Sequence, residues 1–97
     1  MIKVEITDNA KLDLAEIIDY ISLDSPSRAK SYTKQMIAKA TKQISQFPLS
    51  CPLHNKTKGI RRFVYGNYNI YYSVDTIKQS AYILFMMNLA TFRNELI

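Results

Sequence analysis

Cysteine, glycine and histidine are scarce in this 97-residue sequence, and each shortage excludes a kind of chemistry. The single cysteine, Cys51, cannot form a disulfide within the chain, which is typical of a reducing compartment. Two glycines are too few for a glycine-rich loop that binds phosphate. The sequence has only one histidine and one cysteine, which are too few to form a set of metal ligands, so we expect no metal and no other cofactor.

Long apolar runs are also missing. The longest, residues 81–87, is far shorter than the roughly 20 residues that a membrane-spanning helix needs. Acidic residues interrupt the first positions of the chain, which argues against a secretory signal. We therefore expect a cytoplasmic protein without a membrane partner.

Acidic residues are absent from the middle of the chain. Residues 1–24 carry six acidic and two basic side chains, whereas residues 25–74 carry nine basic side chains and no acidic one. The formal net charge is +5. Such a segment predicts a surface for an anionic partner, either nucleic acid or an acidic protein, and a solvated basic face is the alternative interpretation.

The N-terminal half predicts a strand and two helices. Residues 2–6 alternate apolar and polar side chains, which is the pattern of a half-buried strand. Either Thr7 or Asp8 can cap a following helix, whose apolar residues recur at helical spacing. The pair Ser25-Pro26 predicts the start of a second helix, which continues to about residue 47 and stops at Pro48.

The C-terminal half predicts strands. Residues 48–58 indicate a loop, and residues 59–75 indicate a β-hairpin turning at Gly66-Asn67, two residues that tolerate positive φ. Residues 81–87 are apolar on both faces, as in a central strand. We predict one α+β domain over residues 1–97: an N-terminal strand, a two-helix antiparallel hairpin, then a three-stranded antiparallel segment completing one sheet.

Three ordered stretches carry a family likeness. Residues 10–21 contain D-L-x-x-I-x-x-Y-I, residues 25–48 run from Ser-Pro to Phe-Pro, and residues 59–75 contain G-x-R-x-F followed by G-x-Y-N-I-x-Y-x-V-D. Together they resemble the RelE/ParE superfamily of bacterial toxins from type II toxin–antitoxin systems. The first helix resembles the ParE side more closely.

The resemblance implies a partner and two alternative targets. Such toxins are neutralised by a cognate antitoxin, which we expect to be acidic, and they use no small-molecule cofactor. The ParE side binds and inhibits DNA gyrase, and this is the leading hypothesis. The RelE side acts with the ribosome as an mRNA endonuclease, and this is the alternative. Loss of toxicity is a third possibility.

The candidate site residues are cations and phenols around the hairpin. Metal-free RNA cleavage needs an acid, a base and cations near the phosphate, so the candidate catalytic residues are Arg61, Arg62 and Arg93. The residues expected to bind RNA or another target are Lys56, Lys58, Arg61, Arg62, Tyr68 and Tyr71.

Two observations weaken the endonuclease hypothesis. Asn69 stands where the superfamily has an arginine that stabilises the phosphate in its ribonuclease branch. Neighbouring residues of a strand point to opposite faces, so only one of Arg61 and Arg62 can face a given cleft. His54, the lone histidine, is interpreted as a solvated loop residue.

Overall fold

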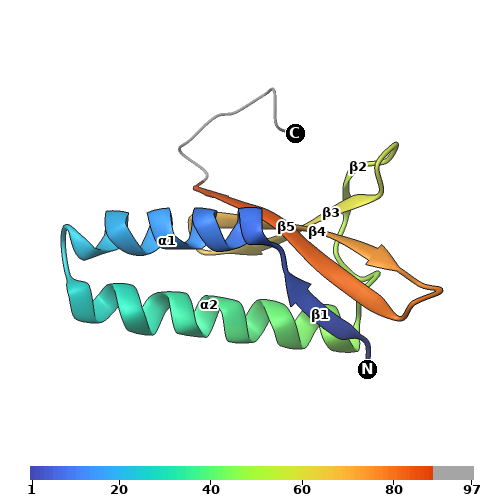
Figure 1. The fold of residues 1–97 in the computed structure, drawn as a ribbon, viewed down its shortest axis with the longest axis horizontal. Helices are drawn as coiled ribbons and strands as arrows, with labels where there is room; N and C mark the ends of the chain where they lie inside the picture. Colours follow the sequence, from blue (N-terminus) through green and yellow to red (C-terminus); the bar gives the residue numbers. More distant parts are fainter. Residues whose placement is uncertain (89–97) are drawn as a thin grey trace.

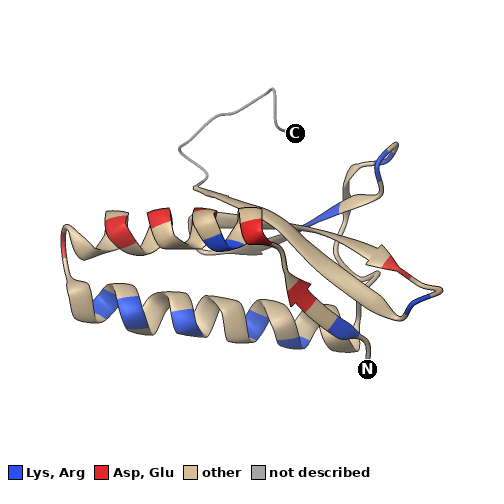
Figure 2. Ribbon diagram, viewed as in Figure 1, with Lys and Arg blue, Asp and Glu red and all other residues tan. Residues whose placement is uncertain are grey.

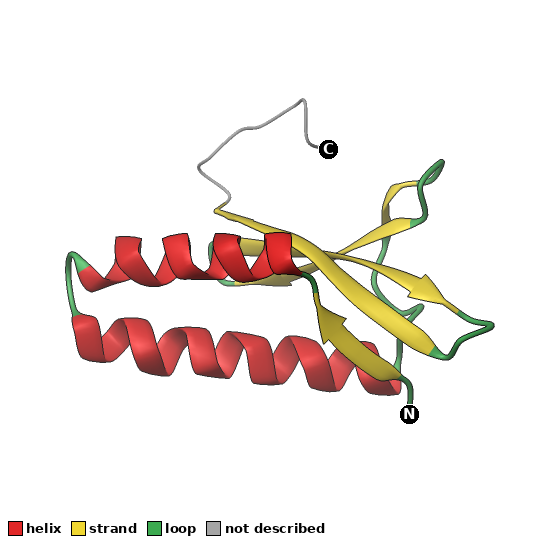
Figure 3. Ribbon diagram, in the orientation of Figure 1, coloured by secondary structure: helices red, strands yellow, loops and turns green. Residues whose placement is uncertain are grey.

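A single mixed sheet with a helical hairpin on one face forms the described part of the chain, residues 1–88 of this computed structural model (Figure 1). The elements are β1 (Lys3–Ile6), α1 (Asp8–Ser22), α2 (Pro26–Gln46), β2 (Leu53–Asn55), β3 (Ile60–Tyr65), β4 (Tyr68–Asp75) and β5 (Ser80–Asn88). The strand order is β1-β5-β4-β3-β2, with β1 parallel to β5 and the other neighbours antiparallel. Figure 3 shows the two helices side by side, and the predicted α+β fold is confirmed.

Both helices begin at the residues that their capping signals predict. The Thr7 hydroxyl accepts a hydrogen bond from the Ala10 N–H at 3.2 Å, and the Ser25 hydroxyl accepts one from the Arg28 N–H at 3.2 Å. Each serves a backbone donor that has no partner inside its helix. Pro26 occupies the first turn of α2, where its missing N–H costs nothing.

The main core lies between the helices and the sheet. Its buried members are Ala10, Ile17, Met36, Ala40, Ile44, Tyr68, Ile70, Tyr72, Ala81, Ile83 and Met86. A smaller cluster, which includes Ile60, Tyr71 and Met87, lies apart from it. Residues from β4 enter both clusters, because β4 is the middle strand and is buried on both faces.

One predicted loop contains a strand. Residues 48–58 include β2, which pairs antiparallel with β3 at one edge of the sheet, so the antiparallel segment has four strands rather than three. β2 has only three residues, and its register shifts between Leu53 and Asn55. A strand this short carries no alternating pattern to distinguish it from a loop.

The β3–β4 turn needs a glycine at its first central position. Gly66 has φ +55°, whereas Asn67 is not among the residues with positive φ, which is the pattern of a type II′ turn. A Cβ on Gly66 would collide with the Tyr32 hydroxyl from α2. The turn therefore depends on glycine for its backbone angle and also for the close approach of α2.

Side chains of α1 replace a neighbouring strand along part of β5. β1 pairs only with the stretch of β5 from Ser80 to Ile83. Beyond it, Asn9 Nδ2 donates to the Leu84 carbonyl at 3.2 Å, and Asp13 Oδ2 accepts from the Met86 N–H at 3.0 Å. The free edge of β5 is thereby hydrogen-bonded to the helix that crosses it.

Charge is segregated between the two helices. Figure 2 shows acidic residues along α1 and basic residues along α2. Within residues 1–88 no Lys or Arg of α2 forms an ion pair with a carboxylate. The positive charge of α2 is therefore directed to solvent. No helix in this range is both long and apolar enough to cross a membrane.

Candidate functional site

The candidate residues on β3 and β4 lie on different faces of the sheet. In the β3–β4 ladder Arg61 is opposite Tyr72, and Arg62 is opposite Tyr71. Opposite residues share a face, so Arg61 lies on the helix-covered face with Tyr72, and Arg62 lies on the other face with Tyr71. Tyr68, four pairs away from Tyr72 and therefore on the same face, is buried in the helix-covered core. The sheet itself separates the two arginines.

Arg61 anchors the loop that leads from α2 to β2. Its Nη1 donates to the Cys51 carbonyl at 2.6 Å and to the Leu49 carbonyl at 3.1 Å. A guanidinium bound to two carbonyl oxygens has fewer donors left for a phosphate. These contacts give Arg61 a role in fixing residues 49–51 against the sheet.

Tyr71, which is opposite Arg62 in the ladder, belongs to a cluster of rings on the face of the sheet away from the helices. The His54 ring centroid lies 4.9 Å from that of Tyr71, and the Phe85 centroid lies 4.8 Å from it. The Tyr71 hydroxyl accepts a hydrogen bond from Asn69 Nδ2 at 3.1 Å. Tyr71 is 2 % exposed, so its ring does not offer a face to a base. His54 was predicted to lie in a loop, and this is wrong: it lies in β2, half-buried, with its ring against Tyr71.

The remaining candidates lie elsewhere. Lys56 and Lys58 are exposed in the β2–β3 turn, where the Lys58 N–H donates to Asn55 Oδ1 at 3.0 Å. Arg93 lies outside the described residues. The candidate set is therefore spread over both faces and one turn. Within residues 1–88 no three His, Cys, Asp or Glu side chains approach closely enough to hold a metal.

Tyr72 is a structural phenol. Its hydroxyl donates to the Pro48 carbonyl at 2.9 Å, and its ring is fully buried. Burial in the core raises the pKa of the Tyr72 phenol well above its usual value, and the neighbouring Cys51 thiol raises this pKa further. The folded state therefore holds this proton at a pH where the unfolded chain releases it.

Replacing Tyr72 with phenylalanine is expected to cost about 1 kcal/mol of unfolding free energy near neutral pH, because the hydrogen bond to Pro48 is lost. The same substitution should also make the unfolding free energy fall less steeply at alkaline pH. The contribution of the Tyr72 proton is present below about pH 10, the pKa of an unfolded tyrosine, and is lost as the pH rises through the higher folded pKa. Urea unfolding at pH 7, 10 and 11 measures both effects. The exposed Tyr20→Phe serves as control, and equal alkaline losses in wild type and Tyr72→Phe would contradict the assignment.

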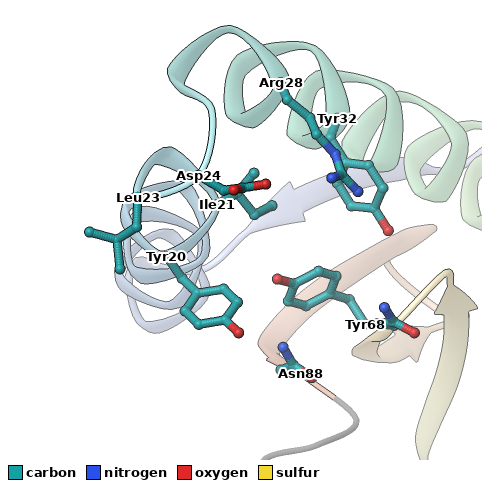
Figure 4. Close-up of a pocket in the computed structure, with 9 residues that line it drawn as sticks. Tyr20, Ile21, Leu23, Asp24, Arg28, Tyr32, Tyr68 and Asn88 are labelled. Atoms are coloured by element: carbon teal, nitrogen blue, oxygen red, sulfur yellow. The ribbon is translucent and has the colours of Figure 1, made fainter.

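A cleft that the sequence did not predict opens where the helical hairpin meets the β3–β4 turn. Its volume is about 830 Å³. The residues that line it are Tyr20, Ile21, Leu23, Asp24, Arg28, Tyr32, Asn67, Tyr68 and Asn88. Figure 4 shows the Tyr68 hydroxyl directed toward Tyr20, with the Arg28 guanidinium and the Asp24 carboxylate on the helical side. Three phenols, one cation and one anion thus line one space.

The cleft collects residues from four separate elements. Tyr20 belongs to α1, Arg28 to α2, Tyr68 to β4 and Asn88 to β5. Burial raises the pKa of the Tyr68 phenol, and Tyr32 and Tyr20 raise this pKa further, whereas a hydrogen bond to Asn88 and the charge of Arg28 lower it. Tyr20 and Tyr68 each stand in a family pattern, but in two different patterns, and no single motif links the four positions in the sequence.

Comparison with known proteins decides the family. The model of the ParE toxin of type II toxin–antitoxin systems, parDE, matches residues 4–84. The chain belongs to the ParE toxin family. The match covers every element from β1 to most of β5 and includes Tyr20, Arg28 and Tyr68. It confirms the resemblance to the RelE/ParE superfamily, on its ParE side.

Solved structures of toxin–antitoxin complexes share the fold. A chain of the chromosomal ParDE system from P. aeruginosa superimposes with TM-score 0.72 at 22% identity, covering 91% of this chain and 96% of that one. A chain of the RelBE2 toxin–antitoxin complex from Mycobacterium tuberculosis gives TM-score 0.67 at 22% identity, covering 90% of each. No curated protein matches the sequence. At 22% identity, the likeness to these two structures establishes only the fold of this ParE family member.

Proposed function

We propose that this ParE family member is a single-domain toxin, spanning residues 1–97, that binds and inhibits DNA gyrase and is neutralised by a cognate acidic antitoxin. The observation that carries the proposal is the dispersal of the candidate catalytic groups. Arg61 is bound to the carbonyls of Leu49 and Cys51, while Arg62 lies on the opposite face of the sheet. A phosphoryl-transfer site needs its acid, base and cations to converge, whereas a binding surface does not.

The acidic antitoxin is supported by charge. Residues 25–74 carry nine basic side chains and no acidic one, and the cations of α2 make no ion pair within residues 1–88. An acidic partner would neutralise this positive charge. Electrostatic attraction between the two proteins would also speed their association.

Ribosome-dependent mRNA cleavage is the second candidate, and one cluster favours it. Arg62, Tyr71 and His54 bring a guanidinium, a phenol and an imidazole together on the open face. These are the group types that a metal-free endonuclease uses as cation, acid and base. Two observations count against catalysis by these three side chains: Tyr71 is buried, and its hydroxyl accepts a hydrogen bond from Asn69.

Two assays on purified protein separate the candidates. We expect stoichiometric protein to stop DNA supercoiling by gyrase, addition of the acidic antitoxin to restore it, and mRNA in a translating bacterial extract to stay intact. Ribosome-dependent cuts within codons, with unaffected supercoiling, would overturn the gyrase proposal. In that case Arg62→Ala should abolish cleavage, while Lys78→Ala, which removes an exposed charge from the β4–β5 turn, should not.

A further inference from the structure

A row of three tyrosine rings with a cation at each end runs along one flank of α2 up to the cleft. The Lys39 ammonium lies 5.7 Å from the ring centroid of Tyr65. The Tyr65 ring packs edge-on against Tyr32 at 5.3 Å, and Tyr32 packs edge-on against Tyr68 at 6.0 Å. Tyr68 and Tyr32 in turn line the cleft beside Arg28. The contacts form one continuous band from Lys39 to Arg28.

A third cation extends the band along the helix. Lys39 and Lys42 follow Arg28 by 11 and 14 residues, which is about three and four turns of an α-helix. All three side chains therefore project from the same side of α2, over about 21 Å. All three are exposed. Lys30 and Lys34 lie outside this flank, because they are rotated about 160° and about 120° from Arg28 around the helix axis.

We propose that this flank and the cleft bind single-stranded nucleic acid. Arg28, Lys39 and Lys42 follow its phosphates, and one unpaired base enters the cleft beside Tyr20. Tyr20 is 64 % exposed, so its ring is available to stack. A cleft of about 830 Å³ lies within the range that accommodates a small organic ligand, and so has room for a base with its sugar.

The polar groups of the cleft favour a base over an acidic peptide. Asn67 supplies both a donor and an acceptor, which matches the mixed pattern on the edge of a base. The Asp24 carboxylate can accept hydrogen bonds from a base amino group or a sugar hydroxyl. The same carboxylate repels the side chains of an acidic peptide. This inference does not depend on whether gyrase is the target.

Fluorescence anisotropy of a labelled 12-nucleotide single strand tests the proposal on purified protein. With three phosphate contacts, a plot of log K against log salt should have a slope of about −2. Changing Arg28, Lys39 and Lys42 together to glutamine should weaken binding about tenfold or more at 50 mM salt and remove most of the slope. Tyr20→Ala should weaken binding about tenfold at constant slope.

A charge-matched variant controls for net charge. Lys30→Gln, Lys34→Gln and Lys78→Gln remove three exposed cations away from the flank, and this protein should keep the wild-type affinity and slope. Equal weakening by the two triple variants would overturn the proposal, as would equal binding of a duplex of the same sequence. Displacement of the strand by poly-glutamate at equal charge concentration, with no effect of Tyr20→Ala, would assign the flank to an acidic protein instead. These readouts do not involve gyrase, so they can fail independently of the proposed function.

Discussion

Replacing Gly66 with alanine should lower the free energy of unfolding by about 3 kcal/mol. Gly66 has φ +55°, a conformation that costs an L-residue about 1–2 kcal/mol. The added Cβ also collides with the Tyr32 hydroxyl, so the Tyr32 side chain must shift. Such a shift disturbs the edge-on contacts of Tyr32 with Tyr65 and Tyr68. Urea unfolding followed by circular dichroism measures the loss.

Gly59 offers a matched control. It has φ +67°, but a Cβ there meets no atom within 4 Å. Gly59→Ala should therefore cost only the backbone term of about 1–2 kcal/mol. Equal losses at the two glycines would show that the approach of Tyr32 to the turn adds nothing. A second variant, Tyr32→Phe combined with Gly66→Ala, should recover part of the loss because it removes the colliding hydroxyl.

Replacing Asp13 with alanine should destabilise the protein by about 2 kcal/mol. The Met86 N–H on the free edge of β5 donates to Asp13 Oδ2 at 3.0 Å, and hydrogen bonds to charged groups contribute about 1.5–3 kcal/mol. Without this acceptor the amide lies beside α1 with no strand to pair it. Amide hydrogen exchange should therefore accelerate at Met86 more than at Ile83, which lies in the part of β5 that pairs with β1.

The same helix supplies the control for charge. Asp19 is an exposed carboxylate of α1, and Asp19→Ala should change the unfolding free energy by less than about 0.5 kcal/mol. Asp13→Asn keeps an acceptor oxygen, so its loss of unfolding free energy should lie between those of Asp13→Ala and Asp19→Ala. Identical effects of the Asp13 and Asp19 changes would show that the contact with β5 does not stabilise the fold.

Local patterns predicted most of the elements because each is encoded by neighbouring residues. Thr7 and Ser25-Pro26 mark the helix starts, and Gly66 marks the hairpin turn. β2 was not predicted, because a strand of three residues is too short to show an alternating pattern. The parallel pairing of β1 with β5 joins residues at opposite ends of the domain, and no local signal specifies it.

The site was less predictable than the fold. The alternation of a strand separates Arg61 from Arg62, but the carbonyls that bind Arg61 come from an irregular loop. The burial of Tyr71 depends on its contacts with His54 and Phe85, which lie on two other strands. The cleft is built from positions on four elements, so its existence depends on tertiary packing.

The parallel pairing of β1 with β5 has a consequence for biosynthesis. β1 leaves the ribosome first, yet Lys3 pairs with Ser80 and Ile6 with Ile83, near the end of the described chain. Until β5 is translated, the apolar side of β1 and α1 has no partner in the sheet. An interrupted translation product therefore lacks the folded toxin surface. The sheet can form in full only when β5, the last of the described strands, has been synthesised.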